Sequence, residues 1–325
     1  MLPTISIIMP VLNREDTIEK AIQSVLNQQY ENIELIILDG GSSDQTVNII
    51  KQYETHLTYW HSERDGSAAA ATNVGIQKAK GDLIALLMAD DWFEPGTFHQ
   101  IAKAYQQSPD ADMFTCAGRI VTNDKNNYVV LKTYNTAKRM QLNFYNICFD
   151  ITSAICCRFI KRSLYERIGI FIPFDEKGDQ FLTNDKEFLL RAVLNKAKDV
   201  FVNHLGHTYL AHKESFSFAN NQAISIKHCH EHMQIVNDYL KNKPLSKSQK
   251  YLLIAWYHDQ AARLVMYKLL EKKFNVAAHI FKNTFKRYPI LCPIIFSYTA
   301  IKIISKRSLR KLRSCLFKYE VMGMQ

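Results

Sequence analysis

The 325-residue chain lacks the features that mark several common protein classes. Its seven cysteines form no C-x-x-C pair and no metal-like spacing with histidine, so neither a disulfide framework nor a zinc module is indicated. The amino terminus has no charged segment followed by a long apolar core, and residues 5–11 are only long enough for a strand. Free thiols in a reducing compartment and a cytoplasmic location are therefore the expectation.

The chain also lacks an apolar run of the roughly 20 residues that a membrane-spanning helix needs. The candidate at residues 290–304 is too short and is interrupted by Pro293 and Lys302. A Gly-rich, basic phosphate loop after the first expected strand is missing too, since residues 10–15 read Pro-Val-Leu-Asn-Arg-Glu. That absence disfavours a nucleotidyltransferase.

What is present is typical of a globular protein with one large domain and an appendage: 47% of residues are hydrophobic and 22% are charged. The net charge of +10 is unevenly distributed. From residue 241 to the end there are 18 Lys/Arg and 3 Asp/Glu, whereas the first 240 residues hold 23 and 28. This asymmetry indicates an anionic partner for the tail.

Short apolar runs alternate with helix-period segments up to residue 116, which predicts a parallel α/β sheet with right-handed crossovers. The expected strands are residues 5–9, 33–38, 57–61, 83–88 and 112–116, and the expected helices are residues 15–27, 44–54, 68–78 and 97–107. A hairpin is expected over residues 119–133, followed by strands at 154–158, 200–203 and 208–210, helices at 161–168 and 184–194, and a loop at 170–181. Beyond residue 217 the expected elements are all helices, at 245–270, 273–288 and 290–318.

The run at residues 83–88 is followed by two adjacent carboxylates, Asp90 and Asp91. The carboxyl end of a buried strand is where open α/β sheets bind ligands, and two acids there repel each other unless a cation balances them. The pair also fits a solvated loop and a helix N-cap.

Two other expected strands end in polar, turn-rich loops, at residues 10–15 and 39–46. Glycines in the second loop let the backbone approach a ligand, and Ser43 or Asp44 can cap the helix that follows. Each loop alone fits an ordinary turn, but three such loops at one edge of the sheet favour a binding site.

Taken together, these segments resemble the family 2 glycosyltransferases, which have the GT-A nucleotide-diphospho-sugar transferase fold. The matching segments are residues 5–15, 21–28, 33–46, 62–66, 73–76 and 80–91. The resemblance implies a Rossmann-like, mostly parallel α/β sheet flanked by helices over residues 1–215, with a helical appendage at 216–325. The nucleotide-binding half would be residues 1–116 and the acceptor-side half 117–215.

The resemblance also implies a role for each matching residue. Nucleotide-sugar binding falls to Pro10, Asn13, Glu15, Asp39, Asp65 and Asp90, with Asp39 at the base and Asp90 near the ribose or sugar. Asp91 would coordinate Mn²⁺ or Mg²⁺, ions that prefer oxygen ligands and neutralise charge on a departing diphosphate. His212, in the segment His212-Lys213-Glu214-Ser215, would be a second ligand or a diphosphate contact; a lone surface histidine is the alternative.

Asp185 takes the position of the family's general base at the start of a helix, and Asn184 replaces the neighbouring acid. An ordinary first-turn helix acid is the alternative reading of Asp185. Leu12 and Met88 depart from the family pattern, at positions where an aromatic residue and an Asp or Asn, respectively, are common. These departures leave the donor sugar and the nucleotide open.

The tail at residues 302–318 interleaves Lys and Arg with apolar residues, as a helix on an anionic membrane surface does. The alternative is a helical subdomain whose cations are simply solvated, and no motif supports nucleic-acid binding. We therefore expect a metal-dependent inverting glycosyltransferase, cytoplasmic or peripheral on the inner face of the plasma membrane. It would transfer a sugar from a UDP- or GDP-sugar to a glycan or lipid-linked acceptor in surface polysaccharide synthesis. A catalytically silent nucleotide-binding or scaffold protein of the same fold is the rival hypothesis.

Overall fold

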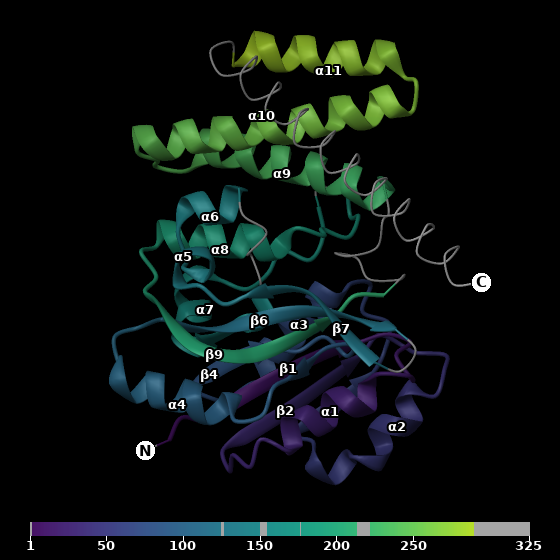
Figure 1. Ribbon diagram of the computed structural model, residues 1–325, viewed down its shortest axis with the longest axis vertical. Helices are drawn as coiled ribbons and strands as arrows, with labels where there is room; N and C mark the ends of the chain where they lie inside the picture. Colours follow the sequence, from purple (N-terminus) through teal and green to yellow (C-terminus); the bar gives the residue numbers. More distant parts are fainter. Residues whose placement is uncertain (1, 125–126, 150–154, 176, 213–221, 289–325) are drawn as a thin grey trace, which may run out of the picture. The chain divides into compact units, whose positions relative to one another are not determined.

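The computed structural model describes residues 2–124, 127–149, 155–175, 177–212 and 222–288. The chain divides into two compact units, Met1–Asn220 and Asn221–Gln325 (Figure 1). The sequence places this division at residue 215, and the structure places it at residue 220.

The first unit contains a nine-stranded sheet and its flanking helices. The strands are β1 (Ile5–Val11), β2 (Ile33–Asp39), β3 (Tyr59–Ser62), β4 (Leu83–Leu86), β5 (Trp92–Phe93), β6 (Met113–Asp124), β7 (Asn127–Tyr134), β8 (Arg158–Lys161) and β9 (Asp199–Leu210). The helices are α1 (Ile18–Leu26), α2 (Thr46–Gln52), α3 (Ala68–Lys78), α4 (Thr97–Gln107), α5 (Ala137–Met140), α6 (Phe144–Phe149), α7 (Arg162–Ile168) and α8 (Asn184–Leu194), with 3₁₀ turns at Glu54–His56 and Ile155–Cys157.

The strand order is β3-β2-β1-β4-β8-β6-β9-β5, with β7 paired to β6. The first four strands in this order are parallel, and β6 and β9 form a second parallel pair. This arrangement confirms the expected α/β sheet. Because the first four strands run in one direction, the loops that follow β1, β2 and β4 all leave from the same edge.

The central strands are buried over almost their whole length, as expected for continuous apolar runs in a parallel sheet. Proline has no N–H to donate to a neighbouring strand. Pro10 is tolerated in β1 because the pairing with β4 ends at Ile8 and Leu86, so β4 requires no donor at Pro10. Helix α1 covers the sheet with apolar residues at helical spacing, namely Ile18, Ala21, Ile22 and Val25.

Most expected elements of the first unit are present, two expected strand regions differ, and the short helices α5 and α6 are additional. Residues 155–157 form a 3₁₀ turn, so the strand expected at 154–158 begins only at Arg158. The two short strands expected at 200–203 and 208–210 are one strand, β9, whose pairing with β6 shifts register twice around Ala117. Such irregularities break the alternation that identifies a strand in a sequence. The two-residue strand β5 was not expected.

The second unit consists of the helices α9 (Gln222–Asn242), α10 (Lys247–Leu270) and α11 (Phe274–Arg287) among its described residues. The expected helices at 245–270 and 273–288 are thus confirmed. Helix α10 packs against both α9 and α11, and Ser246 and Gln249 form a capping box at its start. The helix expected at 290–318 lies outside the described residues. Within the described part, none of the helices combines the length and apolar character that a bilayer crossing requires.

Candidate active site

The loops after β1 and β2 are joined by reciprocal hydrogen bonds. Asn13, at φ +50°, accepts from the Ser43 N–H at 2.9 Å and donates its own N–H to the Ser42 hydroxyl at 2.8 Å. Glu15 accepts from the Gln45 N–H at 2.8 Å. The side chains of Asn13 and Glu15 therefore shape a rigid double loop at the carboxyl edge of the sheet.

Asp39 is fully buried at the end of β2. One carboxylate oxygen accepts from the Gly41 N–H at 3.1 Å, the Ser42 N–H at 2.9 Å and the Ser62 hydroxyl at 2.6 Å. The other oxygen accepts from the Ser42 hydroxyl. Asp39 thus holds the turn after β2 and ties it to β3.

Asp65 lies directly beside the same turn. A Cβ on Gly40 would lie 3.2 Å from an Asp65 carboxylate oxygen, so a larger residue there would press on the Asp65 side chain. Burial raises the pKa of the Asp65 carboxyl, and the negative charge of Asp39 adds to the rise. Pro10 is buried in β1, and its pairing partner Leu38 immediately precedes Asp39.

Asp90 lies beside two basic side chains contributed by distant segments. Its Oδ2 is 2.8 Å from His212 Nε2 and 3.7 Å from Arg14 Nε. The three side chains are 18–26% exposed, so a ligand can reach them. Sequence reasoning did not identify Arg14, because a single arginine in a loop carries no motif.

Asp91 has the opposite environment to its neighbour. It is only 5% exposed, and its Oδ1 accepts from the Leu210 N–H at 2.9 Å. Burial raises the pKa of the Asp91 carboxyl well above its usual range, and the charge of Asp90 adds to the effect. Asp91 therefore fixes the end of β9, two residues before His212.

A buried histidine lies behind Asp91. His207 Nε2 is 3.9 Å from Asp91 Oδ2, and its ring packs on Tyr209 at 4.2 Å between centroids. Burial lowers the pKa of His207 to about 3, which keeps the imidazole neutral near pH 7. His207 and Asp91 thus face each other without forming a charged pair.

Asp185 lies in the first turn of α8, and its Oδ1 accepts from the Lys186 N–H at 2.7 Å. The charge of Asp185 and the charges of the acidic pair all affect the pKa of one buried thiol, that of Cys156. Burial raises the pKa of the Cys156 thiol, and the negative charges of Asp91, Asp185 and Asp90 raise it further. Asp185 and the acidic pair, about 95 residues apart in the sequence, thus raise the pKa of the same buried thiol.

Asn184, at the position of the absent neighbouring acid, donates through Nδ2 to the Phe181 carbonyl at 2.7 Å. It therefore holds the entry to α8 and supplies no charge to the site.

Two structural networks near the site were also missed from the sequence. Glu94, just after β5, accepts from Arg119 at 2.7 Å and from the Trp92 indole at 3.1 Å. Buried Arg158 forms an ion pair of 2.7 Å with Asp199, joining β8 to β9. The two ion pairs, Arg119–Glu94 and Arg158–Asp199, each join segments that are far apart in the chain, so no local sequence pattern predicts them.

The donor atoms at the carboxyl edge fit a divalent cation only in part. Asp90 supplies a carboxylate and His212 an imidazole, ligands that Mn²⁺ accepts. Across the described residues no group of three or more His, Cys, Asp or Glu side chains is arranged to hold a metal. A cation here would depend on additional oxygens, which a diphosphate and water provide for Mg²⁺ in many enzymes.

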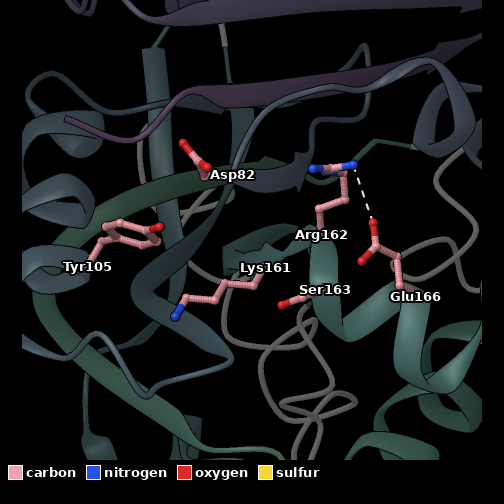
Figure 2. A pocket seen from close by; sticks show the side chains of 6 residues that line it. All are labelled: Asp82, Tyr105, Lys161, Arg162, Ser163 and Glu166. Carbon is pink, nitrogen blue, oxygen red and sulfur yellow. Dashed lines mark ion pairs between the residues drawn. The ribbon is translucent and has the colours of Figure 1, made fainter. Parts of the chain in front are cut away.

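A pocket of about 290 Å³ lies elsewhere and does not contain these residues. Figure 2 shows its lining, which is Asp82, Tyr105, Lys161, Arg162, Ser163 and Glu166. Asp82 precedes β4, whereas Asp90 follows it, so this pocket opens at the opposite edge of the sheet. Its two cations are already engaged, with Arg162 3.3 Å from Glu166 and Lys161 donating to the Pro109 carbonyl.

Comparisons with known proteins identify the family. The family described as glycosyl transferase family 2 matches residues 6–169. An uncharacterized glycosyltransferase of Haemophilus influenzae is 43% identical over 94 residues, which cover 28% of this chain and 38% of that protein. The putative glycosyltransferase EpsH of Bacillus subtilis is 32% identical over 206 residues, 59% of this chain and 58% of that protein. This chain spans less than two thirds of either relative's length.

Solved glycosyltransferase structures share the fold. S. aureus TarS 1-349 in complex with UDP-GlcNAc has a TM-score of 0.60 at 16% identity, covering 95% of this chain and 92% of that one. The mannosyltransferase PcManGT of Pyrobaculum calidifontis, in complex with GDP-Man and Mn²⁺, has a TM-score of 0.57 at 16% identity, covering 97% and 85%. At these identities the likeness establishes the GT-A fold.

Proposed function

The chain belongs to glycosyl transferase family 2, and from this premise we propose that it transfers a sugar from a UDP- or GDP-sugar to a glycan or lipid-linked acceptor. Polysaccharide synthesis is the setting that the likeness to EpsH and TarS supports. The observation that carries the proposal is the contact of Asp90 with His212 at 2.8 Å and with Arg14 at 3.7 Å, after the carboxyl end of β4.

The double loop after β1 and β2 forms the nucleotide side of the proposed site. Asn13 and Glu15 shape this double loop by accepting hydrogen bonds from the Ser43 and Gln45 N–H groups. Asp39 holds the loop after β2 by accepting from the Ser42 N–H. Asp65 closes the side next to Gly40. Both carboxylate oxygens of Asp39 already accept hydrogen bonds from the protein. We therefore propose that Asp39 shapes the pocket for the nucleobase together with Pro10.

Asp90 and His212 are the residues that we assign to a divalent cation, Mn²⁺ or Mg²⁺. Bound there, the ion would offset charge on the diphosphate leaving group. Asp90 is the better ligand of the acidic pair because its carboxylate is accessible, whereas Asp91 is buried and bonded to the Leu210 N–H. Asp91 instead positions His212 by anchoring the end of β9. Arg14 adds a positive charge beside Asp90.

Asp185 is the proposed general base. Its carboxylate would take the proton of the acceptor hydroxyl while that oxygen attacks the anomeric carbon and the diphosphate leaves from the opposite face. This single displacement inverts the anomeric configuration. The charge of Asp185 acts on the same buried Cys156 thiol as the charges of Asp90 and Asp91, which supports a position for Asp185 near the donor.

The second candidate is a catalytically silent nucleotide-binding or scaffold protein of the same fold. Asn184 favours it, since this side chain donates to the Phe181 carbonyl at the position where the family resemblance implies an acid. Met88 favours it for the same reason, as an apolar residue two positions before Asp90. Both candidates bind a donor, and only the first consumes it.

A thermal-shift screen of UDP- and GDP-sugars with and without Mn²⁺ tests donor binding. A ligand at about 100 times its dissociation constant stabilises the folded state by about 2.7 kcal/mol, which a melting curve detects. We expect at least one donor to raise the melting temperature in the presence of Mn²⁺. If no donor raises the melting temperature with or without Mn²⁺, both candidate functions fail.

A further inference from the structure

Helix α11 carries a row of exposed aromatic residues. Phe274, Phe281 and Phe285 are 63%, 41% and 44% exposed. Their spacing of seven and four residues places them on one side of the helix, and the rings of Phe281 and Phe285 lie 6.4 Å apart and nearly parallel. The buried residues of α11, Ala277 and Thr284, lie on a different side of the helix from the three phenylalanines. Helix α11 packs on α10. Exposed large aromatics in a row indicate an interaction surface.

Cations border this row and acids are missing from it. Lys282 and Lys286 follow Phe281 and Phe285 directly, so they flank the aromatic row on its solvent side. From Lys272 to Tyr288 there are five Lys/Arg and no Asp/Glu, and from Lys272 to the end of the sequence there are 12 and 1. We call Phe274, Phe281, Phe285, Lys282 and Lys286 the α11 face.

The composition of the α11 face decides between partners. A second copy of this chain would bring two cationic faces together, which like-charge repulsion opposes. An anionic phospholipid surface instead attracts the lysines, and its headgroup region accommodates aromatic rings. Lysines gain from such a surface only through its negative charge, so this cluster supports binding only when the membrane is anionic.

We propose that the α11 face binds the surface of an anionic phospholipid bilayer, with Phe274 and Phe285 inserted at headgroup depth. Lys282 and Lys286 then lie level with the lipid phosphates. This inference rests on the proposed function, which includes a lipid-linked acceptor. The α11 face is the surface that would bring the protein to the membrane where such an acceptor lies. The helix lies in the membrane plane and does not cross it.

The test is co-sedimentation of the full chain with vesicles of phosphatidylcholine, with and without phosphatidylglycerol. We expect binding only to the vesicles containing phosphatidylglycerol, and weaker binding at high salt. The double variant Phe274→Ser/Phe285→Ser retains every cation and should bind roughly tenfold more weakly, since each ring loses apolar area buried in the membrane. The matched control, Tyr145→Ser/Tyr251→Ser, removes two aromatics that are 59% and 64% exposed outside α11 and should bind as the wild type does.

Equal binding by the Phe274→Ser/Phe285→Ser variant and the wild type would overturn the proposal, as would equal binding to neutral and anionic vesicles. Sedimentation velocity without vesicles tests whether the α11 face binds a second copy of the chain instead. A wild-type dimer that is lost in the Phe274→Ser/Phe285→Ser variant would assign the face to a second copy and overturn the membrane proposal. Matching melting curves verify that the variants are folded. Because no sugar transfer is measured, failure here is distinct from failure of the proposed enzyme activity.

Discussion

The two acids of the Asp90-Asp91 pair should respond differently to the same substitution. Asp90→Asn keeps the side-chain shape but removes the accessible carboxylate that faces His212 at 2.8 Å. Asp91→Asn keeps an oxygen able to accept the Leu210 N–H, and an amide resembles the neutral acid that burial favours at this position. We expect Asp90→Asn to impair catalysis and Asp91→Asn to be tolerated.

The magnitudes follow from these environments. Loss of one preorganised electrostatic contact to developing charge costs about 2.7–4 kcal/mol, so kcat/KM of Asp90→Asn should fall roughly 10²–10³-fold. Asp91→Asn retains its hydrogen bond and loses no charge that the buried site favours, so its kcat/KM should fall less than about tenfold. Asp91→Ala leaves the Leu210 N–H without this acceptor and should lose about 1–3 kcal/mol of folding stability.

The assay is nucleoside diphosphate release from the donor that the thermal-shift screen identifies, at the Mn²⁺ concentration that saturates the wild type. Raising the Mn²⁺ concentration should restore part of the activity of Asp90→Asn, because the remaining His212 and diphosphate ligands still bind the ion weakly. A larger loss in Asp91→Asn than in Asp90→Asn would refute the assignment, and Asp91 would then be the metal ligand.

Three further predictions concern other parts of the first unit. Asp185→Asn should lower kcat roughly 10²–10⁴-fold while leaving donor affinity, measured by titration calorimetry, unchanged. Asp199→Asn leaves buried Arg158 without its charge partner and should cost about 3–5 kcal/mol in urea unfolding, whereas Asp110→Asn breaks an exposed pair without measurable effect. Since burial lowers the pKa of His207 to about 3, the folded state should lose about 2 kcal/mol between pH 7.5 and pH 5.

The sign of the pH effect follows from linkage. The folded state keeps His207 neutral, whereas the unfolded chain protonates it below a pKa of 6.5, so stability is greatest above that pH and declines below it. Other groups also titrate, and His207→Leu isolates the contribution by flattening this part of the profile. An unchanged profile in His207→Leu would contradict the burial argument, and an unchanged kcat in Asp185→Asn would exclude that residue as the base.

Local patterns explain why much of the fold was predictable. The strand at residues 83–86 is a continuous apolar run, and α3 has a serine cap at Ser67 that accepts from the Ala70 N–H. Such signals lie within a few residues of the element they define. The pairing of β9 with β6 depends on two register shifts around Ala117, which no pattern within β9 reveals.

The candidate site shows the same limit. The sequence identifies Asp90 and Asp91 as a pair but carries no sign of which one is buried, because that depends on where β9 ends and on Leu210. The partner of Asp90 is contributed by His212, 122 residues away in the chain. Segments that meet only after folding decide these roles, so the motif locates the site and the structure distinguishes its members.

Glycosyltransferase activity is tested by measuring the release of UDP or GDP from a bound nucleotide-sugar by the purified protein, with and without EDTA. We expect release with Mn²⁺ or Mg²⁺, loss of release on chelation, and recovery when the ion is restored. Donor binding without any release, in the presence of either ion and of candidate acceptors, would contradict the assignment as a glycosyltransferase and leave the silent nucleotide-binding protein in its place.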